Sequence, residues 1–174
     1  MDDAKITTRR QLMTAGTLGL AAVATAGAHA AAAPARNACG GMTRESYLEY
    51  VGLFNANDPR FIEWYHADVE LELSGQVIKG AMAIRDFYKD VKAHIREKVE
   101  ISHFVSDPTG IAGVMPTEFR VYKDWPKPNF FNRDLKAGEV MRTISFGIYW
   151  VDDGKFRQIR TARYQQLNDW RMEG

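Results

Sequence analysis

Apolar residues recur at helical spacing in two segments of the chain, 44–54 and 81–98. The repeating positions are Tyr47, Leu48, Val51 and Phe54 in the first segment, and Met82, Ile84, Phe87, Val91 and Ile95 in the second. Such spacing gathers the apolar side chains on one face of a helix, which can then pack against a core. Pro59 suits the first turn of a short helix that runs through Tyr65. We therefore predict helices over 44–54, 59–65 and 81–98.

Six other segments alternate apolar and polar residues, which is the period of a β-strand. They are DVELELSG (68–75), QVIKG (76–80), VEISHFVSD (99–107), GIAGVMPTEFRVYKD (110–124), EVMRTISFGIYWVDD (139–153) and KFRQIRTARYQQ (155–166). The Asp153-Gly154 pair between the last two segments is typical of a β-hairpin. With the helices, this order predicts an α+β domain in which a curved antiparallel sheet wraps around a long helix.

The segment HADVELE, residues 66–72, carries four potential metal ligands or proton carriers at every second position: His66, Asp68, Glu70 and Glu72. A metal site or an acid/base cluster is one interpretation of this pattern. Three neighbouring carboxylates that face a closed pocket would be costly, however, so the alternate residues Val69, Leu71 and Leu73 should point inward. We therefore predict no metal site in this segment.

Arg142 lies in phase with an apolar series on one predicted strand, formed by Ile144, Phe146, Ile148 and Trp150. We expect this face to be buried, so the charge of Arg142 at its edge requires an anion. Glu118, which shares a strand face with Arg120 and Tyr122, is one candidate, and a substrate is the other. A structural Glu118–Arg142 pair and a substrate-binding role for Arg142 both stay open.

A long Pro-rich connection, WPKPNFFNRDLKAG (125–138), joins two of the predicted strands and carries Trp125, Phe130 and Phe131. Connections of this length in compact domains often act as lids over a binding site. A lid and a simple surface excursion are both open interpretations.

Residues 1–30 have the three-part layout of an export signal. Arg9 and Arg10 lie in a polar start, an apolar stretch rich in Ala and Gly follows, and AHA precedes a cleavage point after Ala30. The arginine pair is similar to that of a twin-arginine signal, and the apolar run is too short to favour a membrane anchor. We predict an export signal (1–30), a flexible leader (31–42), one domain (43–168) and a C-terminal tail (169–174). The mature protein should be periplasmic, with no stable membrane insertion.

Charge and cysteine content narrow the possible functions. Residues 1–30 hold three of the 23 basic and two of the 22 acidic residues, so the exported chain has 20 of each. This neutral balance gives no electrostatic basis for binding nucleic acid. The single cysteine, Cys39, permits neither an internal disulfide nor a cysteine-based metal site.

Residues 47–88 resemble the opening of the NTF2-like, SnoaL-like superfamily. The matching features are FNAND at the end of the first helix, WYHADV before the first strand, and KG-x3-I-x-x-F at the start of the 81–98 helix. The resemblance extends from about residue 43 to 166. It implies a cone-shaped sheet with a deep pocket on its concave face, chemistry without a cofactor, and a homodimer.

Ketosteroid isomerases, polyketide cyclases, limonene-epoxide hydrolases and scytalone or bile-acid dehydratases belong to this superfamily. Tyr50 stands where the isomerases carry a tyrosine in their first helix. Leu73 and Phe146 stand where they carry two functional aspartates, which argues against ketosteroid isomerisation. The dehydratases carry a tyrosine, a histidine and a carboxylate, which correspond by position to Tyr50, His103 and Glu118. Asn55 replaces an aspartate that is frequent in that branch.

The chemistry of these residues fits proton transfer. His103 alternates with Ile101 and Val105, which predicts an inward direction, and imidazole exchanges protons near neutral pH. Tyr50 can donate a hydrogen bond to a developing oxyanion. Burial would raise the pKa of Glu118 into a useful range, and Arg120 would either orient it or bind a phenolate or carboxylate.

We therefore expect a cofactor-independent lyase or dehydratase that breaks a C–O or C–C bond in a bulky aromatic or polycyclic hydroxylated molecule. An isomerase or cyclase of the same superfamily is one alternative, and a non-catalytic periplasmic protein that binds a hydrophobic ligand is another. The expected catalytic residues are Tyr50, His103, Glu118 and Arg120. The expected substrate contacts are Trp64, Tyr65, His66, Tyr122, Arg142, Phe146 and Trp150. No metal is expected.

Overall fold

The computed structural model describes residues 36–37 and 40–173. The predicted export signal (1–30), and residues 31–35 and 38–39 of the predicted leader, lie outside the described residues. The described part of that leader folds back on itself through a bridge between Arg36 and Met42. Asn37 donates a hydrogen bond to Ser106 Oγ at 2.8 Å, and Met42 is buried in the core. Residues 36–37 and 40–42 therefore belong to the domain.

Two helices and a 3-10 turn precede or interrupt the first strands. Helix α1 spans Arg44–Asn55, and the Thr43 side chain caps it by accepting a hydrogen bond from the Ser46 amide. The 3-10 helix η1 spans Pro59–Trp64, and α2 spans Ala81–Lys92. Helix α2 ends six residues before the predicted end. The segment that follows it forms a strand instead.

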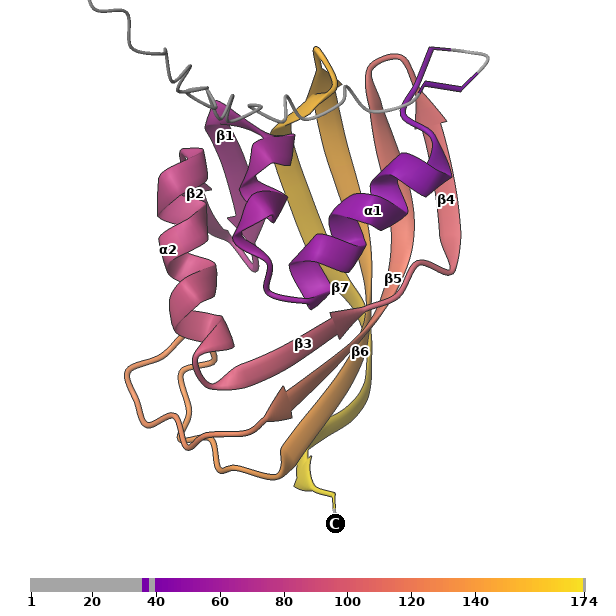
Figure 1. Ribbon diagram of the computed structural model, residues 1–174. Helices are drawn as coiled ribbons and strands as arrows, with labels where there is room; N and C mark the ends of the chain where they lie inside the picture. The colour runs from indigo at the N-terminus through magenta and orange to yellow at the C-terminus, as the bar shows by residue number, and fades with distance from the viewer. Residues whose placement is uncertain (1–35, 38–39, 174) are drawn as a thin grey trace, which may run out of the picture. The chain divides into compact units, whose positions relative to one another are not determined.

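Seven strands form one curved sheet (Figure 1). They are β1 (Tyr65–Leu73), β2 (Gln76–Lys79), β3 (Ile95–Val99), β4 (His103–Asp107), β5 (Gly110–Val121), β6 (Glu139–Asp152) and β7 (Lys155–Met172). Their order is β2-β1-β7-β6-β5-β3, and β4 also pairs with β5. All pairs are antiparallel except β1 with β7, which is parallel. Strand β7 extends through most of the predicted C-terminal tail.

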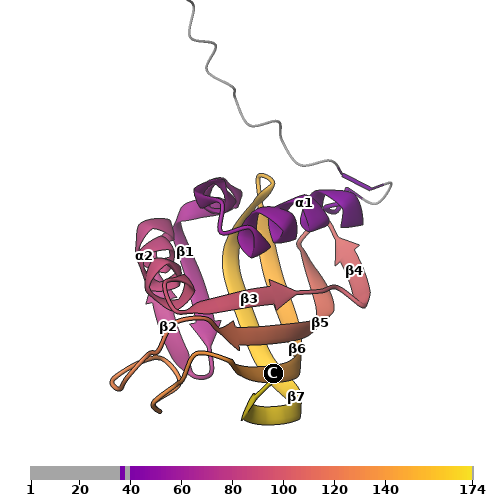
Figure 2. The same cartoon turned by 60° about the horizontal axis from the view of Figure 1, so that its bottom comes forward.

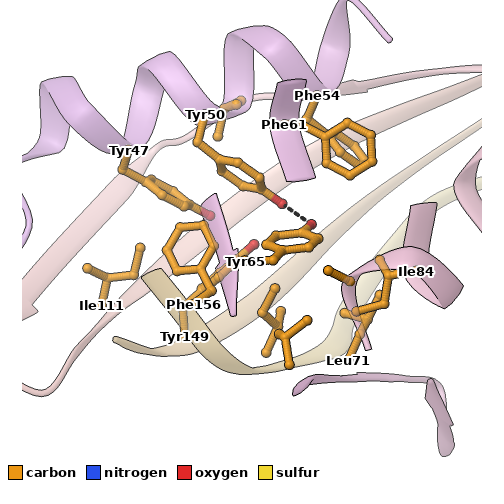
Figure 3. Close-up of a cluster of buried hydrophobic side chains, with 14 of the residues drawn as sticks. Tyr47, Tyr50, Phe54, Phe61, Tyr65, Leu71, Ile84, Ile111, Tyr149 and Phe156 are labelled. Carbon is orange, nitrogen blue, oxygen red and sulfur yellow. Dashed lines mark hydrogen bonds between the residues drawn. The ribbon is translucent and has the colours of Figure 1, made fainter. Parts of the chain in front are cut away.

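The helices lie on the concave side of this sheet (Figures 1 and 2). Helix α1 packs its tyrosine and phenylalanine side chains against the sheet, and α2 packs against β1. The core between them is rich in aromatic rings, including Tyr47, Tyr50, Phe54, Tyr65 and Phe156 (Figure 3). Among the described residues, no helix has the length and hydropathy needed to cross a membrane.

The two faces of β6 are the reverse of those we predicted. Met141, Thr143 and Tyr149 are buried on the concave side, whereas Phe146 and Ile148 are 44% and 47% exposed on the other side. The prediction failed because both faces of this strand carry apolar residues, so periodicity alone could not identify the buried one. The helices determine which face of β6 is buried, since they cover only the concave face of the sheet.

The prediction for HADVELE is correct for the direction of its side chains. Val69 and Leu71 are almost fully buried. Two of the acidic residues form ion pairs outside the core: Glu70 with Lys79 at 2.6 Å and Glu72 with Arg160 at 3.0 Å. In the part of the chain that the structure describes, no three histidine, cysteine or acidic residues are grouped closely enough to hold a metal ion.

Candidate functional site

A cavity of about 130 Å³ lies between the concave face of the sheet and the helices α1 and α2. Aromatic side chains from all three line it: Tyr47, Tyr50 and Phe54 from α1, Phe87 and Tyr88 from α2, and Tyr65, Phe119 and Tyr149 from the sheet. Glu97 and Arg163 are the charged residues among the lining residues. Ser74 and Arg163 are exposed, so they mark the side on which the cavity opens.

Two tyrosine hydroxyls meet at the cavity wall. The oxygens of Tyr50 and Tyr65 lie 2.8 Å apart, and both residues are buried (Figure 3). Burial raises the pKa of both hydroxyls well above the ordinary value, so both remain protonated. One of the two hydrogens is used between the oxygens. Since neither hydroxyl has a second partner among the described residues, the other hydrogen is available to a ligand.

Tyr47 and Tyr149 form a second pair beside the first. Their hydroxyls both donate to Met115 Sδ, at 3.7 and 3.5 Å, and their rings are in edge contact with centroids 5.2 Å apart. Burial raises the pKa of Tyr149 to about 12. Sulfur is a weak acceptor, so these hydroxyls are also able to turn toward a better acceptor in the cavity.

Glu97, on β3, is the one carboxyl that lines the cavity. It forms no hydrogen bond or ion pair within the described chain. Burial raises its pKa from 4.5 to about 7, and the positive charge of Lys92 partly opposes this shift. Glu97 remains partly accessible because it faces the cavity. At neutral pH the carboxyl is therefore divided between its neutral and ionised forms.

Lys92, at the end of α2, is a buried cation on the same side of the domain. Its ammonium group donates a hydrogen bond to the Phe54 carbonyl and lies 3.6 Å from the centre of the Phe54 ring. Burial lowers the pKa of Lys92 to about 8, against an opposing effect of Glu97. Lys92 thus brings positive charge near Glu97 without forming an ion pair with it.

The long connection between β5 and β6 closes one side of the cavity with Phe130 and Phe131. It is held by a bridge between Trp125 and Leu135 and by the Asn129 side-chain amide, which donates to the carbonyls of Trp125, Pro126 and Arg133. Phe130 packs on Phe87 of α2 with centroids 5.3 Å apart. The connection thus combines features of both interpretations. Its two ends form a fixed loop, and Phe130 and Phe131 in its middle line the cavity.

Two of the predicted site residues, Tyr50 and Tyr65, line the cavity. Trp64 does not line it but packs behind them, against Tyr50 and Phe156. His66 lies outside the cavity, where its Nε2 is 3.0 Å from the Asp152 carbonyl.

The inward direction predicted for His103 is wrong. The residue is exposed, and its Nδ1 lies 3.4 Å from Ser102 Oγ. Its strand, β4, turns Phe104 inward against Tyr47 instead. Alternation failed here because Ile101, whose phase we used, precedes β4 and is separated from it by a break in the strand.

Glu118, Arg120 and Arg142 lie together on the convex side of the sheet and do not line the cavity. Glu118 is 2.7 Å from Arg142 and 3.2 Å from Arg120. Glu173 joins them, 2.5 Å from Arg142, and Arg142 lowers its pKa to about 2. The structural Glu118–Arg142 pair is therefore present, and a direct role of these three residues at the cavity is not.

Tyr122, Phe146 and Trp150 also lie outside the cavity. The Tyr122 hydroxyl donates to the Lys92 carbonyl at 2.7 Å. Phe146 packs on Tyr164 at 4.8 Å between centroids, and Trp150 lies beneath the Arg160 guanidinium. The predictions for Phe146 and Trp150 followed from the face of β6 that we expected to be buried, and they failed for the same reason.

Glu97 is the site residue that the sequence-based prediction missed. The 81–98 helix was predicted to continue through it, because Arg96, Glu97 and Lys98 are good helix formers. The signal that could have identified it is the alternation of Ile95, Glu97 and Val99, in which the carboxyl shares a face with two apolar residues. A lone acidic residue in an apolar phase is a candidate for chemistry.

No protein-family model matches the sequence, and no curated protein matches it either. Solved structures do match it in fold. An LEH-like epoxide hydrolase from Mycobacterium tuberculosis has a TM-score of 0.55 at 13% identity, over 67% of this chain and 78% of that chain. A SnoaL-like polyketide cyclase from Agrobacterium tumefaciens has a TM-score of 0.52 at 18% identity, over 67% and 87%.

A computationally designed 17-OHP binder is similar to the same extent, with a TM-score of 0.53 at 17% identity over 67% of this chain and 88% of that chain. The cone-shaped NTF2-like α+β fold that we predicted is therefore confirmed. Two of these three structures bear the names of enzymes, and the third bears that of a binder.

Proposed function

We propose that this protein is a cofactor-independent enzyme that transfers protons on an aromatic, oxygenated small molecule, with Glu97 as the base. The observation that carries this proposal is the Glu97 carboxyl. It faces a cavity lined by aromatic rings and has no hydrogen bond or ion pair within the described residues. A partly desolvated carboxyl that faces a cavity and has no protein partner is a candidate for chemistry on a ligand.

The reaction uses side chains of the cavity alone. The ionised Glu97 removes a proton from a C–H or O–H group of the ligand, and negative charge develops on a nearby ligand oxygen. The spare hydrogen of the Tyr50–Tyr65 pair stabilises that oxygen. Protonated Glu97 then returns the proton to a leaving hydroxyl, which departs as water, or to a different carbon. The first outcome is the lyase or dehydratase reaction expected from the sequence, and the second is an isomerisation.

The pKa of Glu97 suits this cycle. A base that is half protonated near pH 7 both accepts and returns a proton with little free-energy cost. His103, Glu118 and Arg120, which we had expected to act with Tyr50, are replaced in this proposal by Glu97 and Tyr65.

The cavity volume limits the size of the ligand. A cavity of roughly 150 Å³ in another protein holds one benzene molecule, and the volume here is about 130 Å³. We therefore propose one aromatic ring in the enclosed part. A polycyclic ligand requires Phe130 and Phe131 to move outward.

A carbon-acid probe tests the proposal without knowledge of the natural substrate. In 5-nitrobenzisoxazole, removal of the ring C–H proton by a base breaks the N–O bond and releases a coloured nitrophenolate. We expect the full chain to accelerate this ring opening, and Glu97→Gln to slow it by about 100- to 10,000-fold. Glu118→Gln, the matched change on the convex side, should alter the rate less than about twofold. Equal rates for the wild type and Glu97→Gln would overturn the proposal.

A non-catalytic binding protein for a hydrophobic ligand is the second candidate, favoured by the enclosed aromatic cavity. Such a protein would bind single-ring aromatics with the same affinity in the wild type and in Glu97→Gln, and neither would open the probe. Binding by calorimetry and turnover by absorbance, measured on the same samples, separate the two functions.

We also propose that the chain forms a homodimer through the convex face of the sheet. Exposed apolar side chains collect there on neighbouring strands, including Val105, Phe146, Ile148 and Tyr164. Large exposed apolar patches commonly mark such contacts. Sedimentation should give a dimer for the wild type and a monomer for Phe146→Glu; a monomeric wild type would exclude this assembly.

A further inference from the structure

Arg163 is the cation at the open side of the cavity, and it differs from its neighbours on β7. Arg157 and Arg160 on the same strand form ion pairs with Asp152 and Glu72. Arg163 has no carboxylate partner among the described residues; it donates only to the side chain of Gln166 at 2.8 Å. Its positive charge therefore remains uncompensated where a ligand would enter.

Hydroxyl groups surround Arg163 on the concave face. Ser145 is its partner on β6, Thr161 lies two residues before it on the same face, and Thr143 lies two residues from Ser145. None of these hydroxyls has a hydrogen-bond partner within the described chain. Thr143 is only 2% exposed, and it faces the cavity. No buried side-chain oxygen or nitrogen of the described residues lacks a partner, so the Thr143 hydroxyl has surface open to the cavity, where it can meet an acceptor that a ligand brings.

We propose that Arg163, Ser145, Thr161 and Thr143 form a subsite for the carboxylate of an aromatic acid, whose ring and reacting group extend toward Glu97. The guanidinium can hold a carboxylate with two parallel hydrogen bonds. The hydroxyls supply further donors to the same oxygens. This inference rests on the proposed function, which places the reacting end of the ligand at Glu97. It adds that the other end of the ligand carries a carboxylate.

The topology sets the length of such a ligand. Glu97 lies on β3, three strands from β7 in the order β7-β6-β5-β3 (Figure 2). Neighbouring strands are about 4.8 Å apart, which separates the two backbones by roughly 14 Å across the sheet. Glu97 is level with Met141 on β6, through Phe119, whereas Arg163 is level with Ser145, so the register adds roughly 13 Å along the strands. The side chains of Glu97 and Arg163 both extend into the cavity, which shortens the gap between their charged ends. One aromatic ring with a chain of two or three carbons and a terminal carboxylate spans this shorter gap.

A matched pair of probes tests the subsite directly. The carboxylate 3-(4-hydroxyphenyl)propanoate and its neutral carboxamide have nearly the same shape, so their affinities differ through the charged end. We expect calorimetry on the full chain to give at least about tenfold tighter binding of the carboxylate. Arg163→Gln should reduce this ratio to about twofold or less while leaving binding of the amide unchanged. Thr143→Val should weaken binding of the carboxylate by about two- to tenfold.

Arg160→Gln is the control, because Arg160 lies on the same strand but on the opposite face. It should keep the full preference for the carboxylate. Equal binding of both probes by the wild type, an unchanged preference in Arg163→Gln, or no binding of either probe at millimolar concentration would each overturn the subsite.

The two proposals fail separately. Glu97→Gln keeps the carboxylate preference if the subsite exists, whatever its effect on turnover. If that preference holds and Glu97→Gln still opens 5-nitrobenzisoxazole at the full rate, the subsite stands and the proposed base is wrong.

Discussion

Glu97 and Glu118 lie on neighbouring strands, β3 and β5, on opposite faces of the same sheet. Glu118 is held by Arg142 and Arg120 in a partly exposed cluster. Glu97 faces a cavity and has no protein partner in the described chain. A carboxylate whose bonds are satisfied contributes to structure, whereas one left unsatisfied and desolvated keeps its reactivity for a ligand. The partners of an acidic residue therefore indicate its role better than its position in a motif does.

After Glu97→Gln, the largest effect should come from removing a hydroxyl on the concave face, compared with the same change on the convex face. Tyr50→Phe removes the hydrogen-bonded pair that we assign to the developing oxyanion, and we expect turnover to fall by about 10- to 1,000-fold. Tyr164→Phe deletes the same atom on the convex face, where the residue is 65% exposed, and should leave turnover unchanged. Steady-state rates with 5-nitrobenzisoxazole give both values. Similar rates for Tyr50→Phe and the wild type would remove this tyrosine from the site.

Two valines on adjacent strands allow packing on the concave and convex faces to be compared. Val69 on β1 is fully buried, and Val77 on β2 is 52% exposed. Val69→Ala should lower the free energy of unfolding by about 2–3 kcal/mol, from lost burial and a residual cavity. Val77→Ala should change it by less than about 1 kcal/mol. Urea denaturation measures both, and a comparable cost at the two positions would contradict the assignment of faces.

The contributions of acidic residues on the two faces to folding stability should change with pH in opposite directions. Glu97 binds its proton more tightly in the folded chain, with a pKa of about 7 against 4.5. Its contribution to stability is therefore lost as pH rises through that interval. Glu97→Gln should gain on the order of 1–3 kcal/mol relative to the wild type at pH 8, and nothing at pH 4.

Glu173, in the convex cluster, has its pKa lowered from 4.5 to about 2 by Arg142. Its stabilising effect is present above pH 4.5 and is lost as pH falls toward 2. Glu173→Gln should therefore be less stable than the wild type at neutral pH, by an amount that salt reduces. Urea midpoints across pH test both residues; slopes of the same sign would contradict the assigned environments.

The smallest effect is expected at His103. His103→Ala should change neither turnover nor its pH dependence by more than about twofold, because the imidazole lies on the exposed side of β4. A loss of turnover comparable to that of Tyr50→Phe would restore the role that the sequence first indicated for this histidine.

Much of the fold was predictable from local patterns. The first helix and the inward side of HADVELE follow from periodicity, since each has one clearly apolar face. The faces of β6 did not follow, because Phe146 and Ile148 are apolar yet exposed. Only the packing of α1 and α2 decides between two apolar faces, and that is a property of the whole domain.

Less of the site was predictable. Tyr50 and Tyr65 were identified because they belong to segments with a strong pattern. Glu97 was missed because it lies among residues that favour a helix, and the strand there is imposed by pairing with distant β5. Tertiary pairing of this kind overrides local propensity.

The hydrogen bond between Tyr50 and Tyr65 has a polarity that can reverse, since either hydroxyl is able to act as its donor. Whichever oxygen accepts keeps its own hydrogen for the ligand. The pair thus offers one proton at either of two points that lie 2.8 Å apart, without any movement of the rings. Charge that migrates along a conjugated ligand during the reaction could be followed by rotation of two hydroxyl groups. A single tyrosine could donate its hydrogen from only one of these two positions.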